Sequence, residues 1–341
     1  MDALDLESVA RALVSPGKGI LAADESHPTI TKRFAALGIE NTGESRRLYR
    51  QMLFTTPGLA DFISGVILFD ETLRQTADDG TPVPELLARQ GILPGIKVDK
   101  GTKPLAGAAG EVVTEGLDGL RERIGEYKAL GARFAKWRAV ITVGPEIPSR
   151  SCVEANAHSL ARYAALCQEG GLVPVVEPEV LMDGDHTIER CFEVTEATLH
   201  TVFRALRHQR VVPEAMLLKA SMVLAGKGCS RQASVDEVSA ATLRCLRRTV
   251  PAAVPGVVFL SGGQTDVLAT AHLNAMNATG GPHPWALSFS YGRALQDQAM
   301  KVWQGRPALA AAAQQALHHR ARCNGAARDG RYTSALERAL A

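Results

Sequence analysis

The chain has 341 residues, and 38 Lys and Arg face 36 Asp and Glu, so its formal net charge is +2. Hydrophobic residues make up 46% and charged residues 22%, ordinary values for a soluble globular protein. This balance argues against a polybasic nucleic-acid surface, and no apolar stretch approaches the ~20 residues that a membrane-spanning helix requires.

Residues 1–18 predict a short amphipathic helix that ends at Pro16-Gly17. The start of this segment is acidic and has no apolar core, so we expect no signal peptide. Eight short apolar or β-branched runs follow along the chain, at 19–24, 65–70, 93–99, 134–140, 172–179, 215–222, 256–263 and 285–290. Helix-like stretches such as 151–169 and 235–248 lie between them, and 294–325 is an Ala-rich helical extension.

Strands that alternate with helices indicate an α/β protein with a parallel sheet, and eight units predict a closed (β/α)8 TIM barrel. The alternative is an open doubly wound sheet. That fold would usually bind a nucleotide at a glycine-rich first turn, which is missing here, and Ala225-Gly226-Lys227-Gly228 lacks the upstream glycine of a phosphate loop. No linker divides the chain, so we expect one domain over residues 1–341.

Ionisable residues stand at or near the C-terminal ends of the apolar runs: Asp24, Asp70, Lys97, Asp99, Lys136, Arg138, Glu177, Glu179 and Lys219. Any one of them alone could be a solvated loop residue. Residues two apart in a strand share a face, so the spaced pairs each point one way. If that face is the lumen, the charges converge at the mouth where barrel enzymes carry out their chemistry.

A partly desolvated lysine beside another cation can attack a carbonyl, and nearby carboxylates can move the protons. This combination predicts a Schiff-base aldolase. The glycines of Leu260–Gln264 and Ser290–Arg293, after the seventh and eighth runs, suit a phosphate, and Arg293 could add a charged contact. A second cation group, Lys97, Lys136 and Arg138, suggests a substrate with a phosphate at each end.

We expect no metal and no cofactor. The nine histidines lack zinc-ligand spacing, and Asp183-Gly184-Asp185-His186 lacks the rest of a calcium loop, so we interpret it as a solvated turn. Six cysteines are scattered without a C-x-x-C pair, which indicates free thiols in a reducing compartment.

Seven segments in this order resemble class I (Schiff-base) fructose-1,6-bisphosphate aldolase: Gly17–Ser26, Gly95–Gly101, Phe134–Arg138, Val176–Glu179, Leu217–Lys219, Leu260–Gln264 and Phe289–Gln296. The resemblance covers about residues 7–333. It implies a lyase that reversibly cleaves fructose 1,6-bisphosphate to dihydroxyacetone phosphate and glyceraldehyde 3-phosphate. It also implies a cytoplasmic homotetramer that acts on sugar phosphates in glycolysis and gluconeogenesis.

The resemblance implies a role for each matching residue. Lys219 would be the Schiff-base nucleophile, Glu177 the acid and base of carbinolamine dehydration with Glu179 tuning it, Asp24 the aid to C3–C4 cleavage, and Lys136 the electrostatic aid to Lys219. The contacts to the C1 phosphate would be Ser261, Gly262, Gly263, Ser290, Gly292 and Arg293. Those on the C6-phosphate side would be Ser26, Arg33, Lys97 and Arg138, with Arg46 as a further candidate.

Three departures from the family pattern are visible. Ala220-Ser221 follows Lys219 where the family usually has Pro-Asn, and His27-Pro28 follows Ser26 where Thr-Gly is common. Few residues follow Tyr332, so we expect this chain to lack the terminal tyrosine of tailed members and to protonate its enamine more slowly or by other means.

Three other interpretations are open. A transaldolase-like enzyme would use one-phosphate sugars, and the two cation groups favour the bisphosphate. A catalytically silent scaffold should have lost Lys219, Glu177 or Asp24, yet all three are present. A metal-dependent aldolase would need histidines at strand ends, and no predicted strand ends in one.

Overall fold

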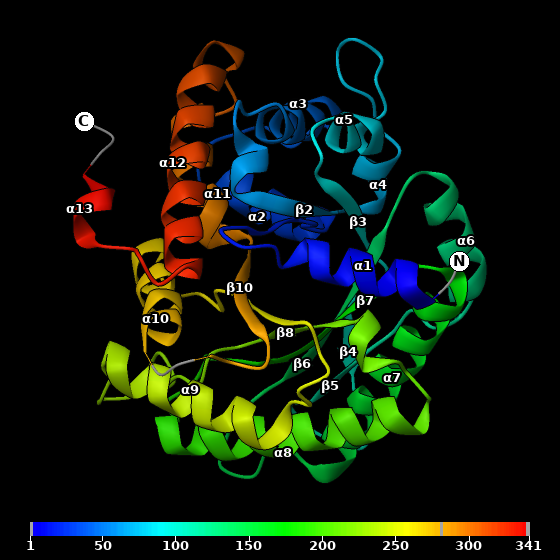
Figure 1. The fold of residues 1–341 in the computed structure, drawn as a ribbon, viewed down its shortest axis with the longest axis vertical. Coiled ribbons are helices and arrows are strands. Elements are labelled where there is room, and N and C mark those ends of the chain that lie inside the picture. Colours follow the sequence, from blue (N-terminus) through cyan, green and yellow to red (C-terminus); the bar gives the residue numbers. More distant parts are fainter. Residues whose placement is uncertain (1–2, 280–281, 339–341) are drawn as a thin grey trace.

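The computed structural model describes residues 3–279 and 282–338. Its central element is a closed barrel of eight parallel strands in the order β1-β10-β9-β8-β7-β6-β3-β2 (Figure 1). The barrel strands are β1 (Gly19–Ala23), β2 (Ile63–Leu68), β3 (Leu93–Lys97), β6 (Phe134–Ile141), β7 (Val173–Val180), β8 (Leu217–Ala220), β9 (Gly256–Phe259) and β10 (Ala286–Tyr291). The prediction of an α/β TIM barrel is confirmed.

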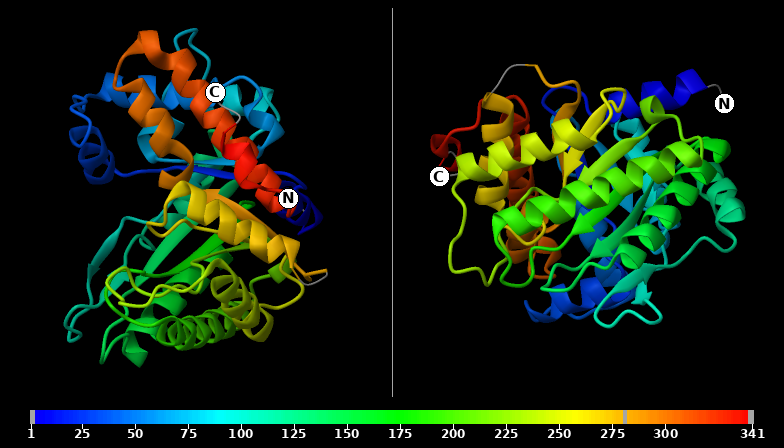
Figure 2. Two further views of the ribbon diagram at one scale, coloured as in Figure 1. Left: turned by 90° about the vertical axis from the view of Figure 1, so that its left-hand side faces the viewer. Right: turned by 90° about the horizontal axis from the view of Figure 1, so that it is seen from below.

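Helices surround the barrel and connect its strands. They are α1 (Ala3–Leu13), α2 (His27–Ala35), α3 (Gly43–Phe54), α4 (Asp70–Leu73), α5 (Val83–Arg89), α6 (Leu120–Ala129), α7 (Arg150–Gly170), α8 (Ile188–His208), α9 (Val235–Thr249), α10 (Asp266–Ala278), α11 (Arg293–Trp303), α12 (Ala310–Arg328) and α13 (Ser334–Glu337). The long helices α7, α8 and α9 lie side by side along one flank (Figure 2).

Local sequence explains where the long helices begin. The side chains of Ser149 and Thr187 accept a hydrogen bond from a backbone N–H of the first turn of α7 and α8. Ser234 and Glu237 form a reciprocal capping box at the start of α9. These caps satisfy backbone donors that would otherwise lack a partner.

The half of the lumen at the N-terminal ends of the strands is apolar, and α1 closes this end of the barrel. Buried residues of this helix, among them Leu6, Val9 and Leu13, belong to one hydrophobic cluster with lumen residues such as Ile20 and Phe134. In Figure 1, α1 crosses in front of the barrel strands. Side chains alternate in direction along a strand, so further inward-pointing positions follow this apolar layer toward the C-terminal end of each strand. The charged residues lie at these C-terminal ends.

Two differences from the sequence prediction affect the strands. The second strand covers residues 63–68 rather than 65–70, so Asp70 begins α4. The sequence prediction also missed an antiparallel hairpin of β4 (Thr102–Pro104) and β5 (Val112–Thr114), because β4 is exposed and its segment carries no apolar alternation.

The C-terminal extension is two helices rather than one. Between α11 and α12, Gln304 and Gly305 both have positive φ, 51° and 72°, which ends α11. Within residues 3–279 and 282–338, no helix is long and apolar enough to cross a membrane. All six cysteines are free thiols, and all but Cys229 are buried.

Candidate active site

An open cavity of about 610 Å³ lies at the C-terminal ends of the barrel strands. It is lined by most of the residues singled out in the sequence: Asp24, Ser26, Arg33, Lys97, Lys136, Arg138, Glu177, Glu179, Lys219, Ser261, Gly262, Ser290, Gly292 and Arg293. These residues come from all the barrel strands except β2, from the loops that follow them, and from the helices α2 and α11, which supply Arg33 and Arg293. The predicted convergence of strand-end charges therefore occurs at the mouth of the barrel.

Three buried ionic side chains and the nearly buried Asp24 form a continuous chain in this cavity. Lys219 Nζ lies 3.2 Å from Glu177 Oε1, and Glu177 Oε2 lies 2.9 Å from Lys136 Nζ. Lys136 Nζ in turn lies 3.1 Å from Asp24 Oδ2. Cations and anions alternate along the chain, so its formal charge is zero, which offsets the cost of removing these groups from water.

Lys136 is the central cation of this chain. Burial alone would raise the pKa of Asp24, but the positive charges of Lys136, Lys219 and Lys97 outweigh it and lower the pKa to about 2. Burial alone would lower the pKa of Lys136, but Asp24 and Glu177 raise it instead. At neutral pH, Asp24 is therefore ionised and Lys136 protonated.

One wall of the cavity is suited to an anion. Gly262 has a φ of 60°, which points the backbone of this turn in a direction that other residues rarely allow. The Ser290 hydroxyl oxygen is buried and has no hydrogen-bond partner within the described part of the chain. Gly292 immediately precedes α11, and helix N-termini favour negative charge.

The opposite wall carries cations that are each paired with a carboxylate. Lys97 Nζ lies 2.7 Å from Asp99 Oδ1, and Arg138 forms an ion pair with Glu179. Arg33, which follows β1 between the two walls, forms ion pairs with Glu25 and with Asp297 of α11, the latter at 2.9 Å. A ligand phosphate on this side would share or replace these carboxylates.

Three residues singled out in the sequence do not line the cavity. Arg46 forms an ion pair with Glu71 at 2.6 Å. Gly263 lies behind Gly262, with Lys227 close to it. Asp70 pairs with Arg74, and both side chains are more than 40% exposed; the expectation that it points into the lumen is wrong because β2 ends two residues before it.

The sequence-based site set omitted two buried carboxylates of the cavity wall. Glu25 follows Asp24 directly and binds Arg33 and also Arg50, at 2.6 Å, and these arginines hold its pKa below the usual range although burial opposes this. Asp99 was noted as a strand-end charge and proves to be the partner of Lys97. Both residues are close in sequence to predicted site residues, and this proximity could have identified them as part of the cavity wall.

A second group of titratable residues lies apart from this cavity. His319 and Cys323 of α12 and Glu337 of α13 place their potential ligand atoms within 4.8 Å of one another. The Glu337 carboxylate already accepts hydrogen bonds from Arg320 and from Tyr332. This pairing fastens α13 to α12.

The chain is similar to aldolases over nearly its whole length. Residues 5–341 match the family model described as fructose-bisphosphate aldolase class-I. A "Probable fructose-bisphosphate aldolase class 1" of Xanthomonas campestris is 62% identical over 328 residues, which are 96% of this chain and 98% of that protein. A "Fructose-bisphosphate aldolase" of Echinococcus multilocularis is 53% identical, covering 98% of this chain and 93% of that one.

A solved structure supports the same similarity. The fructose-bisphosphate aldolase of Plasmodium falciparum, in a ternary complex with TRAP and a small-molecule inhibitor, superposes with a TM-score of 0.96. It is 50% identical, and the alignment covers 97% of this chain and 96% of that one.

Proposed function

The chain belongs to the class I fructose-bisphosphate aldolase family, which cleaves fructose 1,6-bisphosphate reversibly through a lysine Schiff base, and we propose that Lys219 is that lysine. The protein is accordingly a glycolytic lyase that forms dihydroxyacetone phosphate and glyceraldehyde 3-phosphate. The roles of its individual residues are proposals from the geometry and from the resemblance.

The observation that carries the choice of Lys219 is the buried ionic chain. Lys136 lies between two carboxylates that hold it protonated, so its nitrogen has no free electron pair to attack a carbonyl. Lys97 is paired with Asp99 at the rim. Lys219 contacts the carboxylate of Glu177, which is placed to take its proton, and so it is the buried lysine best arranged to react.

The proposed steps follow from these contacts. Lys219 transfers a proton to Glu177, and its neutral amine adds to the C2 carbonyl to form a carbinolamine. Glu177 returns a proton to the departing hydroxyl, so water leaves and an iminium remains. Asp24 accepts the hydrogen bond of the C4 hydroxyl and then takes its proton. C4 becomes the aldehyde of glyceraldehyde 3-phosphate, which leaves, and the C3–C4 electron pair moves into the iminium to give an enamine.

The remaining steps release dihydroxyacetone phosphate, and only the final hydrolysis from Lys219 reverses an earlier step. Protonation of the enamine at C3 regenerates the iminium, and water then hydrolyses it to dihydroxyacetone phosphate and free Lys219. The Lys136 ammonium stabilises Glu177 and Asp24 as anions between their proton transfers. Glu179, paired with Arg138, would tune Glu177 through the negative charge two positions along the same strand.

The two walls would divide the phosphates between them. The C1 phosphate would lie against Ser261, Gly262, Ser290, Gly292 and Arg293, with Gly263 shaping the turn. The C6 phosphate would lie against Ser26, Arg33, Lys97 and Arg138, with Arg46 outside the cavity wall. Cations on both walls support a bisphosphate rather than a one-phosphate sugar.

We also propose that the chain folds as one domain and acts as a homotetramer in the cytoplasm. The family resemblance supports the tetramer, and six free thiols in a closed barrel fit a reducing compartment. Light scattering behind size exclusion would measure the mass of the assembly, and a monomer would contradict the proposal.

Borohydride trapping tests the nucleophile. The protein is incubated with dihydroxyacetone phosphate, reduced, and mapped by peptide mass spectrometry. We expect a stable adduct on Lys219 that is lost in Lys219→Ala and kept in the control Lys301→Met, a change on the exposed face of α11. An adduct on another lysine, or none in a folded protein, would overturn the assignment.

A further inference from the structure

The Lys227 ammonium lies close to the glycine turn of the proposed C1-phosphate site, although Lys227 is not among the residues that line the cavity. A Cβ atom placed on Gly263 would lie 2.7 Å from Lys227 Nζ and 3.5 Å from an Arg293 guanidinium nitrogen. The ammonium and guanidinium groups therefore flank the same point of the turn. The turn comes from the β9–α10 connection, Arg293 from the start of α11, and Lys227 from the loop after β8.

Two sequence segments that the proposed function leaves unexplained hold Lys227 there. The loop Asp183–His186, after β7, and the loop Ala225–Gly228, after β8, are joined by backbone hydrogen bonds. Gly226 N donates to His186 O at 2.8 Å, Lys227 N to Met182 O at 2.8 Å, and Gly228 N to Gly184 O at 2.7 Å. Asp183, Gly184 and Asp185 are exposed, as expected for a solvated turn, and His186 at its end is buried.

Glycine is required at this junction for a steric reason. A Cβ atom on Gly226 would lie 2.5 Å from the carbonyl oxygen of Gly184, and backbone atoms cannot move aside as a flexible side chain can. The close approach of the two loops therefore depends on the missing side chain. It fixes the backbone of Lys227 next to the turn.

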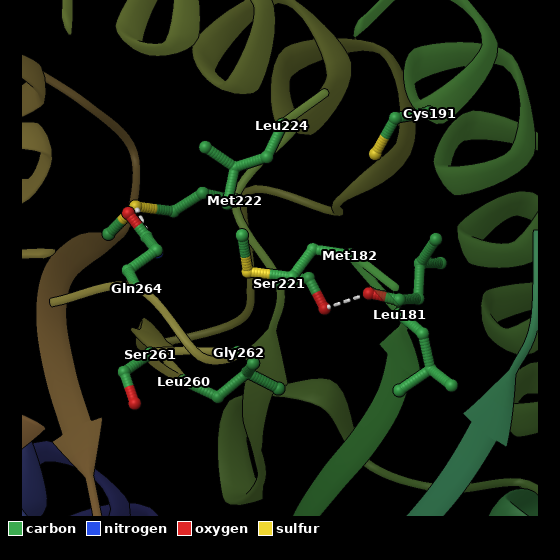
Figure 3. A pocket seen from close by; sticks show the side chains of 11 residues that line it. Leu181, Met182, Cys191, Ser221, Met222, Leu224, Leu260, Ser261, Gly262 and Gln264 are labelled. Atoms are coloured by element: carbon green, nitrogen blue, oxygen red, sulfur yellow. Dashed lines mark hydrogen bonds between the residues drawn. The ribbon is translucent and has the colours of Figure 1, made fainter. Parts of the chain in front are cut away.

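The turn packs against the ends of the neighbouring loops. Leu260, Ser261 and Gly262 pack on the ends of the two neighbouring loops, around a small space lined by residues such as Met182 and Met222 (Figure 3). Ser221 donates a hydrogen bond to Val180 O at 2.8 Å across this space. The turn and the loop that carries Lys227 are thus supported by one packed layer.

Lys227 forms an ion pair with Asp183, and this pair leaves some of its hydrogen-bond donors available for an anion. Its Nζ lies 2.9 Å from Asp183 Oδ1, and its side chain is 44% exposed. An ammonium group has three donors, so it can keep Asp183 and still donate to a second acceptor. Asp183 neutralises the lysine while the phosphate site is empty and restrains the direction of its side chain.

We propose that Lys227 is a further binding residue for the C1 phosphate, positioned by the joined loops 183–186 and 225–228 and restrained by Asp183. This proposal rests on the assignment of the Ser261–Gly263 turn to that phosphate. Lys227 adds a positive charge beside the turn, at the point that the Arg293 guanidinium also approaches. It contributes to holding the phosphate end of the ligand and takes no part in the bond-breaking steps.

The test measures whether loss of the Lys227 charge weakens binding of a phosphorylated ligand more than binding of the same ligand without its phosphate. The Lys219 adduct is trapped with borohydride over a range of dihydroxyacetone phosphate concentrations, and separately with unphosphorylated dihydroxyacetone. The variants are Lys227→Met, which keeps the aliphatic stem, and the control Arg231→Met. Arg231 belongs to the loop after β8 and is paired with Glu237 at the start of α9.

In Lys227→Met we expect the half-saturating concentration of dihydroxyacetone phosphate to rise about tenfold, while that of dihydroxyacetone and the maximal adduct yield stay within about twofold. Arg231→Met should leave both concentrations unchanged. Equal values for wild type and Lys227→Met, or an equal rise for both ligands, would overturn the role of Lys227. Absence of the Lys219 adduct in the wild type would instead overturn the proposed function.

Discussion

Replacing Lys136 with methionine should separate the charge of this side chain from its packing. The substitution Lys136→Met keeps the length of the side chain but leaves Asp24 and Glu177 without their shared cation, which lies 3.1 and 2.9 Å from them. The drop in the pKa of Asp24 from 3.8 to about 2 corresponds to about 2.4 kcal/mol of interaction with its surroundings, and Lys136 is its foremost cation. Loss of one partner from a buried ion pair typically costs 3–5 kcal/mol, so we expect a loss of about 3–5 kcal/mol in the free energy of unfolding near pH 7.5.

The stability difference between the wild type and Lys136→Met should change with pH in a direction that the pKa of Asp24 determines. In the wild type, the lowered pKa of Asp24 contributes stability that is complete above the ordinary value of 3.8 and is lost as the pH falls through about 2. In the variant, only Lys219 and Lys97 still oppose the effect of burial, so the pKa of Asp24 rises and protonation removes its charge as the pH falls. The difference between the two proteins should therefore be smaller near pH 5 than near pH 7.5.

Urea denaturation at these two pH values, with equal protein concentrations, measures the effect. The control is Arg74→Met, which removes a cation from the surface pair with Asp70, where both side chains are more than 40% exposed. Such pairs contribute about 1 kcal/mol or less. If Lys136→Met lost the same stability at both pH values, its effect would be one of packing, and the electrostatic reasoning would be refuted.

Two further predictions concern a buried histidine and a buried hydroxyl. His272 Nδ1 lies 2.6 Å from Gln264 Oε1, and burial lowers its pKa to about 4, so stability should fall by up to about 3 kcal/mol as the pH falls from about 6.5 to 4. His272→Asn keeps a donor in that place and does not titrate, so urea unfolding should show a weaker pH dependence, and an unchanged one would contradict us. The Ser290 hydroxyl has no partner within residues 3–279 and 282–338, so Ser290→Ala should leave the melting temperature nearly unchanged. The same variant should raise the inhibition constant of inorganic phosphate about tenfold, and a lower melting temperature with unchanged inhibition would show that the hydroxyl is structural.

Much of the fold and of the site was predictable because it depends on short-range patterns. Apolar runs at regular intervals predicted the barrel, and alternation along each run placed Lys136 and Glu177 on inward faces. The paired spacing of Lys136 with Arg138 holds in the structure, where both line the cavity. Parallel strands in a closed barrel bring their C-terminal ends to one mouth, so identifying strand-end charges identified most of the cavity wall.

Pairings between residues far apart in the chain could not be predicted in this way. Arg33 binds Asp297, and Lys227 lies against Gly263, because the barrel closes β1 onto β10 and stacks the loops after β7, β8 and β9. The two-residue shift of β2 likewise moved Asp70 out of the lumen. A strand boundary depends on packing against neighbours that its own residues do not reveal.

The sequence by itself determined the class of fold, the order of its strands along the chain, and the ionisable groups available for chemistry, because strand periodicity and residue type are local properties. Only the tertiary structure decided which cation meets which carboxylate. Lys136 lies between Asp24 and Glu177 while Lys219 contacts Glu177, and this difference separates the lysine that stays charged from the one proposed to react. Electrostatic interactions fall off with distance and depend on burial, and both are set only when the barrel closes.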